Sequence, residues 1–194
     1  DLIKSKFIIA PGYICSNDKN ETSNLGRGGS DYSAAIFAKY GDAKSLEIWT
    51  DVSGVYSANP KIVDNALPIE FLSYKEAMEL SFFGAKVIYF PTLQPLIEDN
   101  IPVYIKNTFE PEASGTCISN STKLDQDEIV KGISHIENIS IINFEGSGMV
   151  GVPGFSKRFF ESLSVYKINV VMITQASSEF SICIAVDSDD ALTA

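Results

Sequence analysis

The stretch DYSAAIFAKYGDAKSLEIWT, residues 31–50, places the pattern of a helix directly before the pattern of a strand. One face of the predicted helix carries four apolar side chains, Ala34, Ala35, Phe37 and Ala38. Gly41 is expected to end this helix, because glycine commonly follows the last helical residue. Residues 45–56 then predict a strand that runs into a turn at Ser53 and Gly54.

The same alternation continues on both sides of this stretch. Residues 6–14, KFIIAPGYI, and residues 101–108, IPVYIKNT, predict short strands. Between them, Ser73 and Glu76 form the capping-box pattern that starts a helix, and residues 86–99 contain a proline-broken entry to another helix. Strands that alternate with helices at these intervals predict an α/β domain with a mainly parallel sheet.

A polar segment separates this domain from a second one. Residues 109–128 are rich in Glu, Ser, Thr, Asp and Asn and form the best candidate boundary, so the expected domains are 1–128 and 129–194. The elements predicted beyond it are a strand, a helix and two strands, at residues 139–146, 151–168, 169–177 and 179–187. This β-α-β-β order suits a small α+β sandwich.

The composition excludes several classes of protein. The formal net charge of −10 argues against a nucleic-acid-binding protein, because phosphate contacts need a basic surface. No apolar run is long enough to span a membrane. The three cysteines are far apart and form no disulfide framework, so a cytoplasmic location is expected. His135 is the only histidine, which disfavours a hydrolase triad or a histidine-rich metal site. We interpret the chain, which begins at Asp1 without a signal-peptide pattern, as an internal piece of a longer protein.

A glycine-rich loop, LGRGGSDYSAA at residues 25–35, leads into the first predicted helix. Its glycines permit backbone angles that other residues avoid, and Arg27 between them is suited to binding a carboxylate or phosphate through two hydrogen bonds. The loop is neither a Walker A motif nor a GxGxxG dinucleotide motif. A plain turn with Arg27 in solvent is the alternative interpretation.

Two further segments carry polar side chains at expected element ends. In IWTDVSGVYSANPK, residues 48–61, Thr50 and Asp51 follow a strand, where ligands of open α/β sheets bind. A β-turn capped by Asp51 is the alternative there. In FFGAKVI, residues 82–88, Lys86 is either a surface lysine with a buried stem or a cation that stabilises phosphoryl oxygens.

These three segments, in this order and at these intervals, resemble the aspartokinases of the amino-acid kinase superfamily. The C-terminal part, with VKGISHI and VVMITQASSEFSI, resembles the ACT regulatory domains that follow the kinase domain. The pattern is most similar to the bifunctional aspartokinase–homoserine dehydrogenases. The resemblance implies the C-terminal part of an amino-acid kinase domain followed by an incomplete ACT domain.

The resemblance also implies a role for individual residues. Arg27 and Ser30 would bind the substrate aspartate, with Gly28 and Gly29 lining its site. Asp31 would organise the catalytic lysines, and Lys86 would stabilise the transferring phosphoryl group. The implied ATP contacts are Thr50, Asp51, Tyr56, Lys61, Lys86 and Val87. Lys61 stands where the family often has an arginine, so the charge remains but the two-pronged geometry is lost.

The implied activity is aspartate kinase, with ATP and Mg²⁺, in the first step of threonine, methionine and lysine biosynthesis. The β-carboxylate of aspartate would attack the γ-phosphate of ATP and give 4-phospho-L-aspartate and ADP. A carboxylate is already ionised at neutral pH, so no general base is needed. Threonine is the effector implied for the ACT part, with Gln175 as its contact, and a homo-oligomer through ACT domains is implied too.

Some features depart from the family. No Lys-Phe-Gly-Gly segment is present, and the sequence after Lys86 reads VIYFP without the usual histidine. An amino-acid sensor without turnover, and an amino-acid kinase with another substrate, therefore stay open as alternatives. We expect the 194-residue piece by itself to be inactive.

Overall fold

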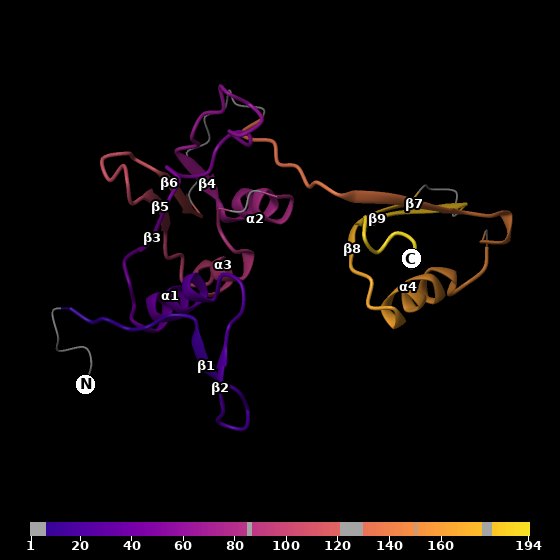
Figure 1. Cartoon of the computed structure of the whole chain (residues 1–194), viewed down its shortest axis with the longest axis horizontal. Coiled ribbons are helices and arrows are strands. Elements are labelled where there is room, and N and C mark those ends of the chain that lie inside the picture. The colour runs from indigo at the N-terminus through magenta and orange to yellow at the C-terminus, as the bar shows by residue number, and fades with distance from the viewer. Residues whose placement is uncertain (1–6, 85–86, 121–129, 150, 176–179) are drawn as a thin grey trace. The chain divides into compact units, whose positions relative to one another are not determined.

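The computed structural model describes residues 7–84, 87–120, 130–149, 151–175 and 180–194. It divides into two compact units, the first ending at His135 and the second beginning at Ile136 (Figure 1). The division lies a little beyond the boundary expected at residue 128, which itself falls outside the described residues.

A four-stranded sheet forms the centre of the first unit. Its strands are β3 (Leu46–Thr50), β5 (Val103–Asn107), β6 (Thr116–Ser119) and β4 (Phe71–Ser73), in that spatial order. The pairs β3–β5 and β4–β6 are parallel, and β5–β6 is antiparallel. The mainly parallel α/β sheet is therefore confirmed. The interpretation of residues 109–128 as a boundary was wrong in part, because β6 lies within them and pairs with both β5 and β4.

Three helices accompany the sheet: α1 (Gly29–Tyr40), α2 (Tyr74–Phe82) and α3 (Phe90–Ile97). The predicted capping box of Ser73 and Glu76 is present at α2, and Gly41 follows the last residue of α1. Ala35 and Ala38 of α1 are buried as predicted, but Phe37 is 57% exposed. The apolar face that residue spacing predicts covers a wide arc of the helix, and Phe37 lies at the edge of that arc, towards solvent.

Alternate strand residues supply the core of the first unit. The side chains in this cluster that come from the sheet are Leu46, Ile48, Leu72, Val103, Ile105 and Ile118. Leu93 and Leu96 of α3 are fully buried against them. The period of two along each strand thus puts one face of the sheet against the helices.

The predicted strand at residues 6–14 was wrong. Within its described part, residues 7–13 form no strand, and Phe7 and Ile9 are 88% and 99% exposed. A β-branched run becomes a strand only when a neighbouring strand completes its hydrogen bonds. The regular structure starts later, with the hairpin of β1 (Ile14–Ser16) and β2 (Thr22–Asn24).

The second unit has the predicted β-α-β-β order. Its elements are β7 (Ile139–Glu145), α4 (Phe155–Val165), β8 (Val170–Gln175) and β9 (Ser181–Asp187), with a short 3-10 turn at Ser147–Met149. The antiparallel sheet has the order β7-β9-β8. Leu163 of α4 is buried with Ile182, Ile184 and Val186 of β9 in a second core. Among the described helices of both units, none is long and apolar enough to cross a membrane.

Candidate active site

The glycine loop turns tightly against the start of α3. Gly28 caps the N-terminus of α1 with a φ of 69°, a conformation that favours glycine. A Cβ added to Gly28 would lie 2.4 Å from Cβ and Cγ of Tyr89, the residue that caps α3. The loop can approach α3 this closely only because residue 28 has no side chain.

The polar side chains of the loop differ in burial. Arg27 and Ser30 are exposed, so both are accessible to a ligand. Asp31 is half-buried in the first turn of α1, and this burial raises the pKa of its carboxyl group. The loop therefore presents a cation and a hydroxyl to solvent, next to a carboxylate that is partly withdrawn from water.

A residue not predicted from the sequence stabilises this loop from inside. The Ser33 hydroxyl accepts a hydrogen bond from the Tyr13 N–H at 3.0 Å and donates one to the Gly29 carbonyl at 2.8 Å. Ser33 is buried in α1. No sequence pattern singled out Ser33, because only the fold brings Tyr13 near it.

The carboxyl ends of β3 and β5 meet at one edge of the sheet. The two strands are parallel, and Thr50 lies opposite Asn107. The Thr50 hydroxyl donates to an Asp51 carboxylate oxygen at 3.1 Å, and the Thr108 N–H donates to the Thr50 carbonyl at 2.8 Å. The structure thus places the predicted pair Thr50 and Asp51 at the sheet edge where ligands of α/β folds bind.

A hydrogen-bonded chain that the sequence did not reveal lies at the same edge. The side-chain amide of Asn107 donates to the Ser53 hydroxyl at 2.8 Å, which donates to a Glu110 carboxylate oxygen at 2.7 Å. Asn107 is buried. This chain holds the turn after β3 against the end of β5.

Tyr56 lies in a hairpin formed by residues 55–57 and 67–69, which we call the 55–69 hairpin. Tyr56 forms a β-bridge with Pro68, and the Ile69 N–H donates to the Val55 carbonyl at 2.8 Å. The buried Thr116 hydroxyl accepts from the Val55 N–H at 2.8 Å and so fixes the hairpin to β6. Lys61, in the connection between the two arms, is exposed.

The last two predicted site residues of the kinase part, Lys86 and Val87, precede α3 in the sequence. Val87 is partly buried against the core, but Lys86 lies outside the described residues. The described contacts therefore connect the glycine loop with Tyr89 at the start of α3. They also connect the carboxyl ends of β3 and β5 with each other. In the described ranges, no three or more His, Cys, Asp or Glu side chains are grouped to hold a metal ion.

The second unit contains a cavity of about 420 Å³, within the range of small-molecule sites. Its lining residues are Met149, Gly151, Val152, Pro153, Gly154, Phe155, Ser156 and Gln175. Gly154 caps α4 with a φ of 83° and no side-chain hydrogen bond, so the N-terminus of α4, with its partial positive charge, borders the cavity. Gln175 reaches the same cavity from the end of β8.

Comparisons with known proteins divide the chain in a similar way. Residues 1–107 match the model of the amino acid kinase family, and residues 142–194 match that of an ACT domain. The chain is 46% identical over 190 residues to the bifunctional aspartokinase/homoserine dehydrogenase of Haemophilus influenzae. That match covers 97% of this chain but only 23% of the H. influenzae protein.

Two solved structures of one enzyme resemble the fold. E. coli aspartokinase III in complex with aspartate and ADP, in its R-state, has a TM-score of 0.77 and 34% identity, over 91% of this chain and 38% of that one. Its complex with lysine and aspartate, in the T-state, has a TM-score of 0.71 and 33% identity, over 91% and 39%. Since the family model covers more than half of the sequence, this chain belongs to the amino acid kinase family and carries an ACT domain after its kinase part.

Proposed function

We propose that this chain is part of an aspartate kinase, which transfers the γ-phosphoryl group of ATP to the β-carboxylate of L-aspartate. The similarity to aspartokinases over nearly the whole chain supports this proposal. The observation that carries it is the glycine loop, where exposed Arg27 stands at the N-terminus of α1 and Gly28 lies against Tyr89. An arginine beside a helix N-terminus is a good partner for a carboxylate.

The chemistry requires two anions to meet. Arg27 and Ser30 would bind aspartate at the loop, while Thr50, Asp51 and Tyr56 would contact ATP at the strand ends. Lys61 and Lys86 would offset the charge of the phosphates, and Asp31 would orient the lysines. The aspartate oxygen forms a bond to the γ-phosphorus as the bond to the β-phosphate oxygen breaks, which gives 4-phospho-L-aspartate and ADP. No proton needs to be removed from the attacking carboxylate.

Mg²⁺ would be the metal partner of this reaction. In kinase sites it is held by one or two carboxylates together with the phosphates of the nucleotide, so a cluster of three acidic side chains is not needed. When bound, it neutralises charge on the phosphate oxygens. Asp51, at the end of β3, is the carboxylate of the proposed ATP site that fits this role.

Replacing Arg27 tests the proposal. In the full-length protein, Arg27→Ala should raise the KM for aspartate about tenfold or more, because a charge-assisted pair is lost, and should change the KM for ATP less than about twofold. Arg158→Ala is the control, because Arg158 on α4 is also an exposed arginine. Steady-state kinetics with each substrate varied gives both constants. Equal losses for aspartate and ATP would contradict the assigned role.

The same assay separates the alternatives. Phosphorylation of another carboxylate in place of aspartate would favour a different amino-acid kinase. Binding of aspartate without ATP consumption by the full-length protein would favour a sensor without turnover.

We further infer that an amino acid binds in the cavity of the ACT domain and regulates the kinase. Its carboxylate would lie at the N-terminus of α4, and Gln175 would bind a polar group of the ligand. Threonine is the effector we propose. Association through ACT domains and a cytoplasmic location complete the proposal.

A further inference from the structure

The segment that leads from the kinase part to the ACT domain is fixed to the 55–69 hairpin and α2. We call residues 131–135 the connecting segment. The Ile133 N–H donates to the Ser57 carbonyl at 2.8 Å, directly after Tyr56. Gly132 also fits closely here, since a Cβ on it would lie 3.4 Å from the Ser57 oxygen and 3.3 Å from Cδ1 of Ile69.

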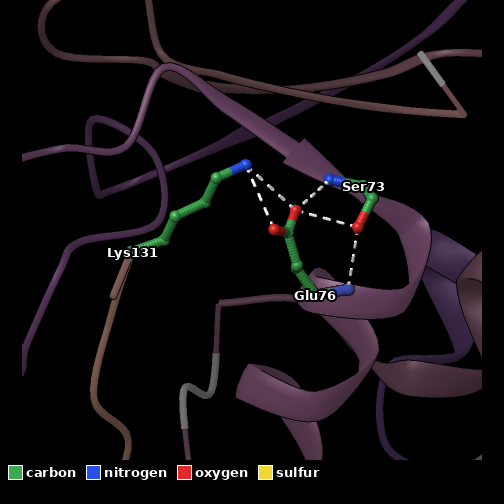
Figure 2. A network of polar contacts seen from close by, with 3 residues as sticks. All are labelled: Ser73, Glu76 and Lys131. Carbon is green, nitrogen blue, oxygen red and sulfur yellow. Dashed lines mark hydrogen bonds and ion pairs between the residues drawn. The ribbon is translucent and has the colours of Figure 1, made fainter. Parts of the chain in front are cut away.

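The first residue of the connecting segment makes an ion pair with α2 (Figure 2). Lys131 Nζ lies 3.1 Å from Glu76 Oε1 and donates to Oε2 at 3.2 Å. Glu76 Oε2 also accepts from the N–H and the hydroxyl of Ser73, at 2.7 and 2.8 Å. Burial alone would raise the pKa of the Glu76 carboxyl, but hydrogen bonds from Ser73 and Lys131 outweigh it and lower that pKa. The carboxylate is thus a charged, well-satisfied anchor for Lys131.

The last residue of the connecting segment lies on the end of α2. The carbonyl oxygen of His135 would be 1.9 Å from a Cβ added to Gly84, so only glycine leaves room for it. Gly84 stands two residues before Lys86 in the sequence. The connecting segment therefore contacts both chain neighbourhoods that carry proposed ATP contacts, at Ser57 and at Gly84.

The ACT domain is anchored almost immediately afterwards. The Asn138 carbonyl accepts from the Ser188 N–H at 2.8 Å, within the second unit. Only Ile136 and Glu137 separate Asn138 from His135, and the three peptide units between these anchors extend to at most about 11 Å. This short connection limits how far the two anchors can move apart.

We propose that residues 131–135 position the ATP-binding hairpin, with Lys131 as a positioning residue. This inference rests on the proposed kinase function. Lys131 would act through Glu76 and through the Ile133–Ser57 hydrogen bond rather than by touching ATP. Its loss should therefore loosen the hairpin that carries Tyr56 and leave the glycine loop unchanged.

Kinetics of the full-length protein tests the positioning role. Lys131→Ala should raise the KM for ATP about threefold or more and change the KM for aspartate less than about twofold. Lys131→Arg, which keeps the charge, should restore the KM for ATP. Lys75→Ala, an exposed lysine beside Glu76 on α2, is the control. A Lys131→Ala enzyme that matches Lys75→Ala, or that loses both substrates equally, would overturn the proposal.

Amide hydrogen exchange with ADP as the probe gives a readout without turnover. In the wild-type full-length protein, saturating ADP should slow exchange in peptides that cover residues 50–61 and also in those that cover 130–135. Protection of residues 50–61 alone would show that the connecting segment does not respond to nucleotide binding, which would reject its positioning role and leave the kinase proposal standing. Protection of neither would reject the proposed ATP site, and the positioning role would fall with it.

Discussion

At the scale of one residue, the burial of Asp31, a proposed catalytic group, lowers the stability of the folded state. Its burial raises the pKa of the carboxyl group, which means that the folded state disfavours the charged form. A raised carboxyl pKa makes folding less favourable once the pH rises above the ordinary range of a carboxyl group. Such a cost is typical of residues held for function, and the place of Asp31 in the first turn of α1, directly after the glycine loop, fits that interpretation.

Gln175 offers a prediction at the same scale. Gln175→Ala in the full-length protein should weaken the proposed inhibition by threonine about tenfold, because the proposed hydrogen bond to the effector is lost, and should leave kcat within about twofold. Thr174→Ala is the control, since alternate residues of β8 face opposite sides of the sheet. Inhibition curves at fixed substrate measure the shift. An unchanged curve for Gln175→Ala would remove this side chain from the effector site.

The residues that the sequence analysis missed are those that stand in no recognisable motif. Arg27 and Thr50 stand in patterns that suggest binding from the sequence alone, and the family resemblance implies a contact at Gln175. Ser33 and Asn107 carry no such pattern. Their importance comes from partners at Tyr13 and Ser53, which only the folded chain brings near.

At the scale of elements, the entry to α1 depends on two glycines with different surroundings. Gly26 and Gly28 both have positive φ, but a Cβ on Gly26 would meet nothing within 4 Å, whereas one on Gly28 would overlap Tyr89. Gly26→Ala should therefore lower the free energy of unfolding by about 1 kcal/mol, the cost of the left-handed conformation alone. Gly28→Ala should lower it by about 2 kcal/mol or more, because the overlap adds to that cost.

Urea denaturation followed by the fluorescence of Trp49, which lies in the same unit, measures both values. Gly26→Ala serves as the control for the backbone conformation. Equal losses in the two variants would show that Tyr89 moves aside at little cost, and that the loop is not held against α3.

Elements with a local signal formed where they were expected. The capping box of α2 closes within four residues, from Ser73 to Glu76, so its sequence contains both partners. The run at residues 7–13 needed a partner strand from elsewhere, and no described strand pairs with it. β6 was not predicted, because its short segment lies in a polar stretch. It becomes a strand only by pairing with β5 and β4.

At the scale of the whole molecule, the two units have separate cores and should unfold separately. Leu163 is buried in the core of the second unit, and Leu163→Ala should destabilise that unit by about 2–5 kcal/mol. The urea transition followed by Trp49 fluorescence should not move, because Trp49 is the only tryptophan and lies in the first unit. Circular dichroism should show an earlier second transition. If the Trp49 transition shifted equally, the two cores would have to unfold together.

The sequence by itself determined the succession of α1, β3, α2, α3 and β5 in the kinase part, the β-α-β-β order of the ACT part and the identity of the polar residues at their loops. These depend on periodicity, capping and turn residues, which act over a few neighbouring positions. The tertiary structure alone decided that Gly28 meets Tyr89, that Asn107 joins Ser53, and that the connecting segment lies on the 55–69 hairpin. Such contacts join residues far apart in the chain, and only packing and long-range hydrogen bonds select them.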